Sequence, residues 1–290
     1  MKDISIKALA KINLGLDVVR KREDGYHEVR MVMQTIHLFD RLEIARTNTG
    51  SIHITTNLSF LPTNENNLVY KAAKLLMDEF GIRDGIDVKL NKHIPVAAGM
   101  AGGSTDAAAV LYGMNRIFEL GLSREELMKR GVKLGADVPY CVMRGTALAE
   151  GIGEELTALP PMVKCPVLVA KPQISVSTKF VYENLKLNQA TKHPDIDRLV
   201  EDIRAKDLQK IAADMGNVLE TVTIPNYPII AEIKQNMMEH GALNAMMSGS
   251  GPTVFGLFDQ ESTAVEAYEA MRASGLAKQI YLTSIYNNAR

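Results

Sequence analysis

The start of the chain alternates between apolar and polar positions. Every second residue from Ile6 to Val18 is apolar, whereas the positions between them include Lys11 and Asn13. A period of two predicts a β-strand with one buried face. After a turn signal, the stretch from His27 to Ile44 is typical of extended structure, with an expected break at Phe39-Asp40-Arg41.

Helical patterns follow this β-rich start. Apolar residues at helical spacing predict a helix from Asn67 to Phe80, which Gly81 can end in a left-handed conformation. A second helix is expected from Asp106 to Phe118. Ser123-Arg-Glu-Glu126 has the sequence of a capping box and predicts a third helix, closed by Gly135. Alternating β and α segments favour an α/β fold.

The proline-containing cluster Leu159-Pro-Pro-Met162 is the best candidate for a domain boundary. We therefore expect two domains, residues 1–160 and 161–290. In the second domain, Val167 to Ala170 predicts the first strand of a new sheet, and Ile229 to Glu239 predicts a helix.

Composition narrows the possible partners. The 290 residues carry 33 Lys and Arg against 34 Asp and Glu, so no overall charge would draw the protein to nucleic acid or to a lipid surface. Cys141 and Cys165 lack the spacing of metal ligands, and we expect buried, reduced thiols. With neither a signal peptide nor a membrane span in the sequence, we expect a cytoplasmic protein. Nothing in the sequence specifies an oligomeric state.

The glycine-rich run Pro95–Thr105 lies between a predicted strand and a predicted helix, where backbone N–H groups and the helix dipole can bind an anion. Three glycines would let the main chain approach phosphate, and Ser104 and Thr105 supply hydroxyl groups. The run is neither a Walker A loop nor a dinucleotide fingerprint. Spacing alone leaves a second interpretation open, a structural turn with Ser104 as the N-cap.

Other polar residues are ambiguous when taken singly. Lys11 and Asn13 could reach one ligand, or form a solvated strand face. Asp137 could be a turn or cap residue ahead of Pro139, or a partly buried general base. The glycine turn from Ser248 to Thr253 could be structural or could close over phosphates.

Three segments, taken in order, resemble the motifs of the GHMP kinases, the superfamily of galactokinase, homoserine, mevalonate and phosphomevalonate kinases. They are Pro95–Thr105, Gly135-Ala-Asp-Val-Pro139 and Met247-Ser-Gly-Ser-Gly-Pro-Thr253. Ala8–Leu14 and Arg22–His27 narrow the resemblance to the branch that phosphorylates the C2 hydroxyl of a methylerythritol carrying cytidine diphosphate, in the non-mevalonate route to isoprenoids. The resemblance covers nearly the whole chain.

This resemblance implies a fold, cofactors and site residues. The implied fold mixes helices and strands (class α/β). It is the two-domain GHMP kinase fold, in which each domain is of the α+β type. Its N-terminal domain resembles the second domain of ribosomal protein S5, with a left-handed βαβ crossover, and its C-terminal domain is ferredoxin-like. The cofactors are ATP and Mg²⁺, and the substrate is a small molecule with a cytidine diphosphate group.

The implied residues fall into three sets. The catalytic pair is Lys11 and Asp137. The ATP loop comprises Pro95, Val96, Ala97, Ala98, Gly99, Met100, Ala101, Gly102, Gly103, Ser104 and Thr105, with Asn67 and Lys92 near adenine or phosphate. Ser104 is the expected Mg²⁺ ligand, for which Asp106 is also plausible. The cytidine diphosphate group is expected at Asn13, Tyr26, His27 and Tyr182.

The sequence departs from the family pattern at three places. Met100 replaces a usual Leu, Ala97-Ala98 stands where many relatives have glycines, and Tyr182 replaces a more usual Phe, which preserves stacking on a pyrimidine. Two other functions remain open. Another GHMP kinase, of the mevalonate or homoserine type, would give no reason for Gly25-Tyr-His27 and Tyr182. A non-catalytic nucleotide-binding module would not need both Lys11 and Asp137.

Overall fold

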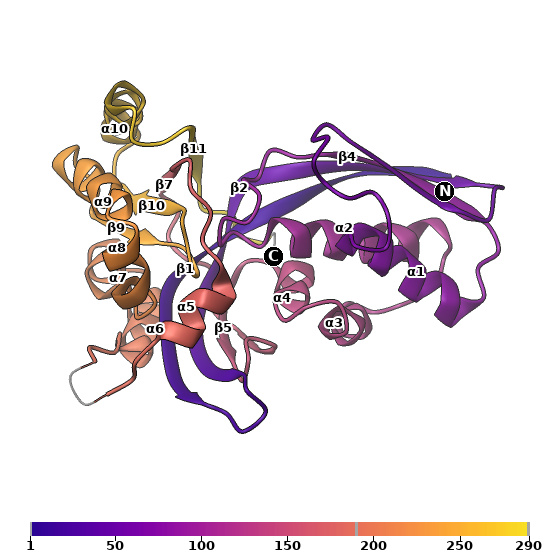
Figure 1. The fold of residues 1–290 in the computed structure, drawn as a ribbon, viewed down its shortest axis with the longest axis horizontal. Helices are drawn as coiled ribbons and strands as arrows, with labels where there is room; N and C mark the ends of the chain where they lie inside the picture. Colours follow the sequence, from indigo (N-terminus) through magenta and orange to yellow (C-terminus); the bar gives the residue numbers. More distant parts are fainter. Residues whose placement is uncertain (1, 189–190, 289–290) are drawn as a thin grey trace. The chain divides into compact units, whose positions relative to one another are not determined.

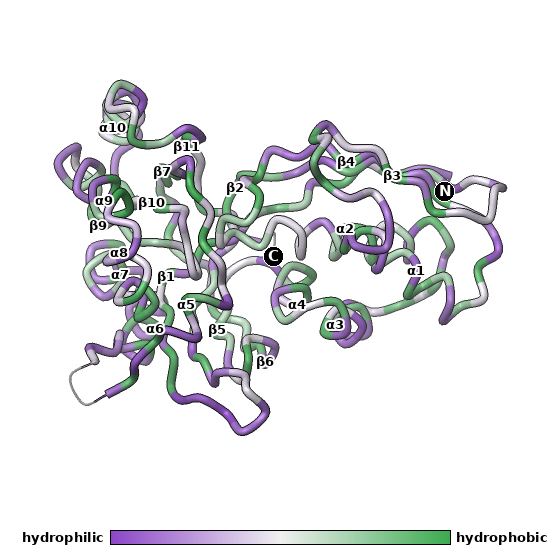
Figure 2. Tube along the Cα trace, in the orientation of Figure 1, coloured by the Kyte–Doolittle hydropathy of each residue, from purple (hydrophilic) through white to green (hydrophobic). Residues whose placement is uncertain are grey.

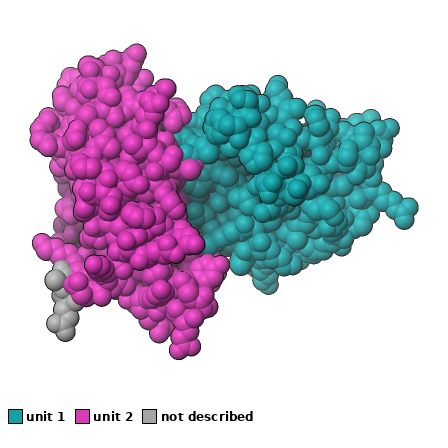
Figure 3. All heavy atoms as spheres, in the orientation of Figure 1, with its two compact units in different colours: residues 1–10, 38–96, 101–143 teal, residues 11–37, 97–100, 144–290 magenta. Residues whose placement is uncertain are grey.

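The computed structural model describes residues 2–188 and 191–288 (Figure 1). The chain divides into two compact units (Figure 3): unit 1 contains residues 1–10, 38–96 and 101–143, and unit 2 contains residues 11–37, 97–100 and 144–290. Because these segments alternate along the sequence, the long strands β1 (Asp3–Lys21) and β2 (His27–Thr47) each contribute to both units. The division into domains at residue 160 stays a prediction.

Unit 1 is a sheet with helices on one face. The strand order is β3 (Ile52–Thr56), β4 (Gly85–Asn91), β2, β1, in which β3 and β4 are parallel and β4 and β2 antiparallel. The helices are α1 (Leu68–Phe80), α2 (Gly102–Ile117), α3 (Arg124–Val132) and α4 (Val138–Met143). Helix α2 packs closely on the sheet, since a methyl group on Gly113 would lie 2.6 Å from Cδ1 of Ile44.

Local capping signals place the helices of unit 1. Asn67 is the N-cap of α1 and accepts a hydrogen bond from the N–H of Val69, and Gly81 ends the helix in the left-handed conformation, as predicted. Ser123 forms the predicted capping box with Glu126. Helix α3 nevertheless ends at Val132 and not at Gly135, because the N–H groups of Lys133 and Leu134 bond to carbonyls three residues back, which tightens the chain into a turn.

Two expectations for the first strands are wrong. All residues of β1 from Ala8 to Leu16 are buried, so both faces of this stretch are buried, whereas Lys7 is exposed and Asp17 half-buried. Strand β2 runs without the break expected at Phe39-Asp40-Arg41, although Asp40 is fully buried. The hairpin between the two strands is hydrophilic, as Figure 2 shows.

Unit 2 contains a four-stranded antiparallel sheet, in the order β11 (Gln279–Ser284), β7 (Pro166–Lys171), β10 (Val254–Leu257), β9 (Asn244–Met247). Strand β7 and helix α9 (Ile229–Glu239) agree with the prediction. The remaining elements are β5 (Thr146–Glu150), β6 (Glu155–Ala158), β8 (Gly216–Asn217), α5 (Thr178–Asn184), α6 (Ile196–Ala205), α7 (Leu208–Asp214), α8 (Glu220–Asn226) and α10 (Glu261–Ser274).

The first strand enters unit 2 between β8 and helix α6. Gly15 and Leu16 pair with Gly216 and Asn217 in parallel, and a methyl group on Gly15 would lie 2.7 Å from Cδ2 of Leu199. The two cysteines are buried free thiols, as predicted, and burial raises the pKa of Cys165 to about 12. Among the helices of the described residues, none combines the length and apolar character that crossing a bilayer requires.

Candidate active site

The glycine-rich run leads into an uncapped helix N-terminus in unit 1. Ala101 is the N-cap of α2, and its side chain has no group that could cap this end of the helix. The N–H groups of Gly102, Gly103 and Ser104 lie in the first turn, where helical geometry offers them no acceptor. Ser104 is therefore not the N-cap, and the turn interpretation based on it is wrong. Three N–H groups and the helix dipole make this end suitable for phosphate.

In unit 2, the middle of the same run packs against the second glycine turn. Oγ of Ser248 donates a hydrogen bond of 2.9 Å to the carbonyl of Gly99. Gly99 has a φ of 73°, and a Cβ at this position would overlap the carbonyl oxygen of Ser248. The turn from Ser248 to Thr253 thus fixes the loop backbone at Gly99, where only glycine fits.

Sequence reasoning missed the residues that hold this second turn. Nδ2 of Asn217 donates to the carbonyls of Met247 and Gly249, at 2.9 and 2.8 Å. Oγ of Ser250 lies 2.8 Å from Oγ1 of Thr178, the first residue of α5. Asn217 belongs to no recognisable sequence motif. Only the glycine that precedes it, in Asp214-Met-Gly-Asn217, could have suggested a turn.

Lys11 and Asn13 lie together in the buried part of β1. Nζ of Lys11 donates to Oδ1 of Asn13 at 2.7 Å, and the two residues are 5% and 0% exposed. The backbone N–H of Lys11 also bonds to the carbonyl of Met100 in the glycine-rich run. These contacts contradict the interpretation as a solvated strand face, and they join the backbone of Lys11 to one residue of the glycine-rich run.

Asp137 is half-buried in unit 1, immediately before α4. Its carbonyl accepts the first helical hydrogen bond, from the N–H of Cys141, and its neighbours Val138 and Pro139 are buried. Lys11 belongs to unit 2, so the pairing of Lys11 with Asp137 stays a prediction.

The two residues expected near adenine or phosphate have structural partners. Both polar atoms of the Asn67 side chain make hydrogen bonds. Oδ1 caps α1, and Nδ2 donates to the carbonyl of Pro62 at 2.7 Å. Lys92 is buried, and its ammonium pairs with Asp40 and with Asp106, the latter at 2.6 Å.

Burial and ion pairing act against each other in this cluster. Burial alone would lower the pKa of Lys92, but the charges and hydrogen bonds of Asp106 and Asp40 outweigh it, so the pKa is raised. Burial raises the pKa of Asp106 well above its usual value, against the opposing attraction of Lys92. Within the part of the chain that the structure describes, no three His, Cys, Asp or Glu side chains gather into a metal site.

Two of the expected cytidine-binding residues meet in unit 2. The rings of His27 and Tyr182 lie 5.0 Å apart at an angle of 41°. Burial, and then the charge of Lys21, lower the pKa of His27, which favours the neutral imidazole. Tyr26, in contrast, is 60% exposed at the hairpin turn.

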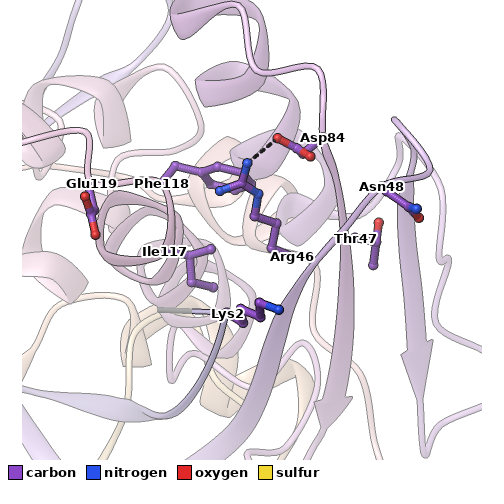
Figure 4. A pocket seen from close by; sticks show the side chains of 8 residues that line it. All are labelled: Lys2, Arg46, Thr47, Asn48, Asp84, Ile117, Phe118 and Glu119. Carbon is purple, nitrogen blue, oxygen red and sulfur yellow. Dashed lines mark hydrogen bonds and ion pairs between the residues drawn. The ribbon is translucent and has the colours of Figure 1, made fainter.

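A hollow elsewhere in unit 1 contains none of these residues. It has a volume of about 560 Å³ and is lined by Lys2, Arg46, Thr47, Asn48, Asp84, Ile117, Phe118 and Glu119 (Figure 4). Arg46 bonds to Asp84 at 2.7 Å and lies over the ring of Phe118. The charge of Arg46 is therefore balanced by Asp84.

Comparison with known proteins identifies the family. Residues 67–145 match the GHMP kinases N terminal domain, and residues 199–276 match the GHMP kinases C terminal domain. A 4-diphosphocytidyl-2-C-methyl-D-erythritol kinase of Lachnospira eligens is 59% identical over 286 residues, covering 99% of both chains. The chain belongs to the GHMP kinases. A kinase of the same name from Clostridium perfringens is 49% identical, covering 98% of this GHMP kinase and 99% of the relative.

Solved structures confirm the two-domain GHMP kinase fold. A crystal structure of 4-(cytidine 5'-diphospho)-2C-methyl-D-erythritol kinase is 31% identical, with a TM-score of 0.84, over 98% of this chain and 100% of that one. A homoserine kinase from Cytophaga hutchinsonii has a TM-score of 0.80 at 20% identity, over 98% and 94% of the two chains, which shows the shared fold alone.

Proposed function

We propose that this kinase transfers the γ-phosphate of ATP to the C2 hydroxyl of 4-diphosphocytidyl-2-C-methyl-D-erythritol, a step toward isoprenoid precursors, in the cytoplasm. The observation that carries the proposal is the 59% identity, over 99% of the chain, to a kinase named for this substrate. The contact between His27 and Tyr182 supports it, because an aromatic pair can stack on a pyrimidine.

In the proposed reaction, the carboxylate of Asp137 accepts the proton of the C2 hydroxyl as that oxygen bonds to the γ-phosphorus and ADP leaves. Lys11 stabilises the attacking oxygen. Its ammonium is buried and already oriented by Asn13, so it loses little freedom when substrate binds. The first-turn N–H groups of α2 would stabilise the charge on the transferred phosphoryl group.

The donor groups fit an Mg²⁺ ion carried by ATP. Asp106 is 2% exposed and engaged by Lys92, whereas Ser104 is half-buried in the first turn of α2. We therefore assign Ser104 as the protein ligand, with phosphate oxygens and water completing the octahedron that Mg²⁺ prefers. When bound, the ion would neutralise charge on the phosphates.

The decisive experiment measures ADP release with 4-diphosphocytidyl-2-C-methyl-D-erythritol and with the same polyol lacking cytidine diphosphate. Turnover with the first compound alone is expected, and equal rates with both would contradict the proposed substrate. Tyr182→Ala should raise KM for the cytidine compound by about 5- to 150-fold, the equivalent of about 1–3 kcal/mol of stacking. Tyr182→Phe is the matched control, because it keeps the ring and should keep KM nearly unchanged.

A further inference from the structure

The buried carboxylate of Asp40 binds the chain just before the ATP loop. Asp40 is 0% exposed in the middle of β2, and its Oδ1 accepts hydrogen bonds from the N–H groups of His93 and Ile94, at 2.5 and 2.8 Å. Its Oδ2 accepts from the ammonium of Lys92. One side chain thus fixes three consecutive residues that lead into the glycine-rich run.

The same cluster fixes the chain just after the loop. The ammonium of Lys92 bonds to Oδ2 of Asp106 in α2, 2.6 Å away. A methyl group on Gly102 would lie 3.3 Å from Nζ of Lys92 and 3.2 Å from Cγ2 of Ile94. Residues on the two sides of the loop are therefore packed together at its base, around one buried charge cluster.

The loop between these two ends contains strained backbone. Ala97 and Ala101 have φ angles of 50° and 55°, in the left-handed region that alanine avoids. A backbone conformation of this kind persists only where contacts with the surrounding residues hold it in place. At Ala101, the surroundings include the first turn of α2, which the cluster holds through Asp106.

We infer that Asp40 is a positioning residue for ATP: it holds both ends of the loop so that the first-turn N–H groups of α2 point at the phosphates. The inference rests on the proposed function, in which this loop binds ATP. It assigns Lys92 to the support of the loop, since the ammonium of Lys92 is occupied by two carboxylates.

Asp40→Asn tests the inference with almost no change in size. The three described hydrogen bonds of Asp40 are all donated to it, and they use both of its oxygens as acceptors. An amide supplies one acceptor, and its NH₂ group must then face either Lys92 or the N–H groups of residues 93 and 94. We expect KM for ATP to rise at least about tenfold, as for loss of one hydrogen bond to a charged group, with KM for the cytidine substrate little changed.

Asp106→Asn is the matched control inside the cluster. Among the residues that the structure describes, only Oδ2 of Asp106 has a hydrogen-bond partner, Lys92, and an asparagine can still accept from Lys92. It should raise KM for ATP much less than Asp40→Asn does. Ile44→Ala, on the same strand, controls for general instability: it should lower the melting temperature without a selective change in KM for ATP.

One further variant keeps the inference testable if Asp40→Asn does not fold, and a second variant tests the role of the strained backbone if it does. Gly102→Ala should raise KM for ATP, because its methyl group would press on Lys92 and Ile94. Adding Ala101→Gly to Asp40→Asn should recover part of the ATP affinity, because glycine adopts the left-handed conformation without strain. An unchanged KM for ATP in Asp40→Asn or in Gly102→Ala, or an equal rise in Ile44→Ala, would overturn the inference. A wild-type enzyme that turns over ATP only with another alcohol would instead overturn the proposed substrate.

Discussion

Asp137 carries the most specific chemical expectation at the scale of single residues. Asp137→Asn keeps the shape of the side chain and removes its ability to take a proton. We expect kcat to fall by about 10²–10⁴, the usual contribution of a general base. The measurement is ADP release at saturating substrates.

Nucleotide affinity provides the control for this variant. Titration calorimetry with ADP should give the wild-type affinity, because Asp137 lies outside the glycine-rich run. A kcat within about threefold of wild type would exclude a base role and leave positioning as the source of catalysis.

The start of helix α1 depends on Asn67. Its side-chain oxygen accepts from the N–H of Val69, and its side-chain nitrogen donates to the carbonyl of Pro62. Asn67→Ala should lower stability by about 1 kcal/mol, and Asn67→Ser, which can still cap, by less. Thermal unfolding measures the difference. If Asn67 also contacts adenine, Asn67→Ser will raise KM for ATP with only this smaller loss of stability. An unchanged KM would restrict Asn67 to its structural role.

The glycine-rich run depends on one close backbone approach. Gly99→Ala places a Cβ against the carbonyl of Ser248 and adds left-handed strain, so we expect about 2–4 kcal/mol of destabilisation. Gly103→Ala is the matched control, since its methyl group would lie 3.5 Å from Leu68 Cδ1, an ordinary contact. Calorimetric melting should separate the two variants clearly. Equal melting temperatures would mean that the loop can move away from Ser248.

Helices whose capping residues lie next to them in the sequence could be predicted. Features that depend on a partner far away in the sequence could not. Asn67, Gly81 and Ser123 act on neighbouring residues, so their helices were predictable. Asp40 resembled a break in the strand because its partner Lys92 is 52 residues away. The motif positions of Lys11 and Asn13 were evident, but their burial depends on chain that packs over them from elsewhere in the fold.

At the scale of the whole molecule, the alternation of segments predicts how fragments behave. Residues 11–37 belong to the unit that is otherwise formed by residues 97–100 and 144–290. A fragment of residues 1–160 would lack β8 and α6, which cover β1 near Gly15. We expect this fragment to expose apolar surface, bind a hydrophobic dye and lack the cooperative melting of the full chain. Cooperative melting without dye binding would instead support independent domains divided at residue 160.

The contact between Gly99 and Ser248 also has a consequence for synthesis of the chain. These residues are 149 positions apart, so the loop backbone at Gly99 lacks its partner until most of the polypeptide has been made. A nascent chain that has passed Thr105 contains every loop residue and yet cannot complete the loop before Ser248 is made. Competence to bind ATP should therefore arise late, when the last strands of unit 2 leave the ribosome.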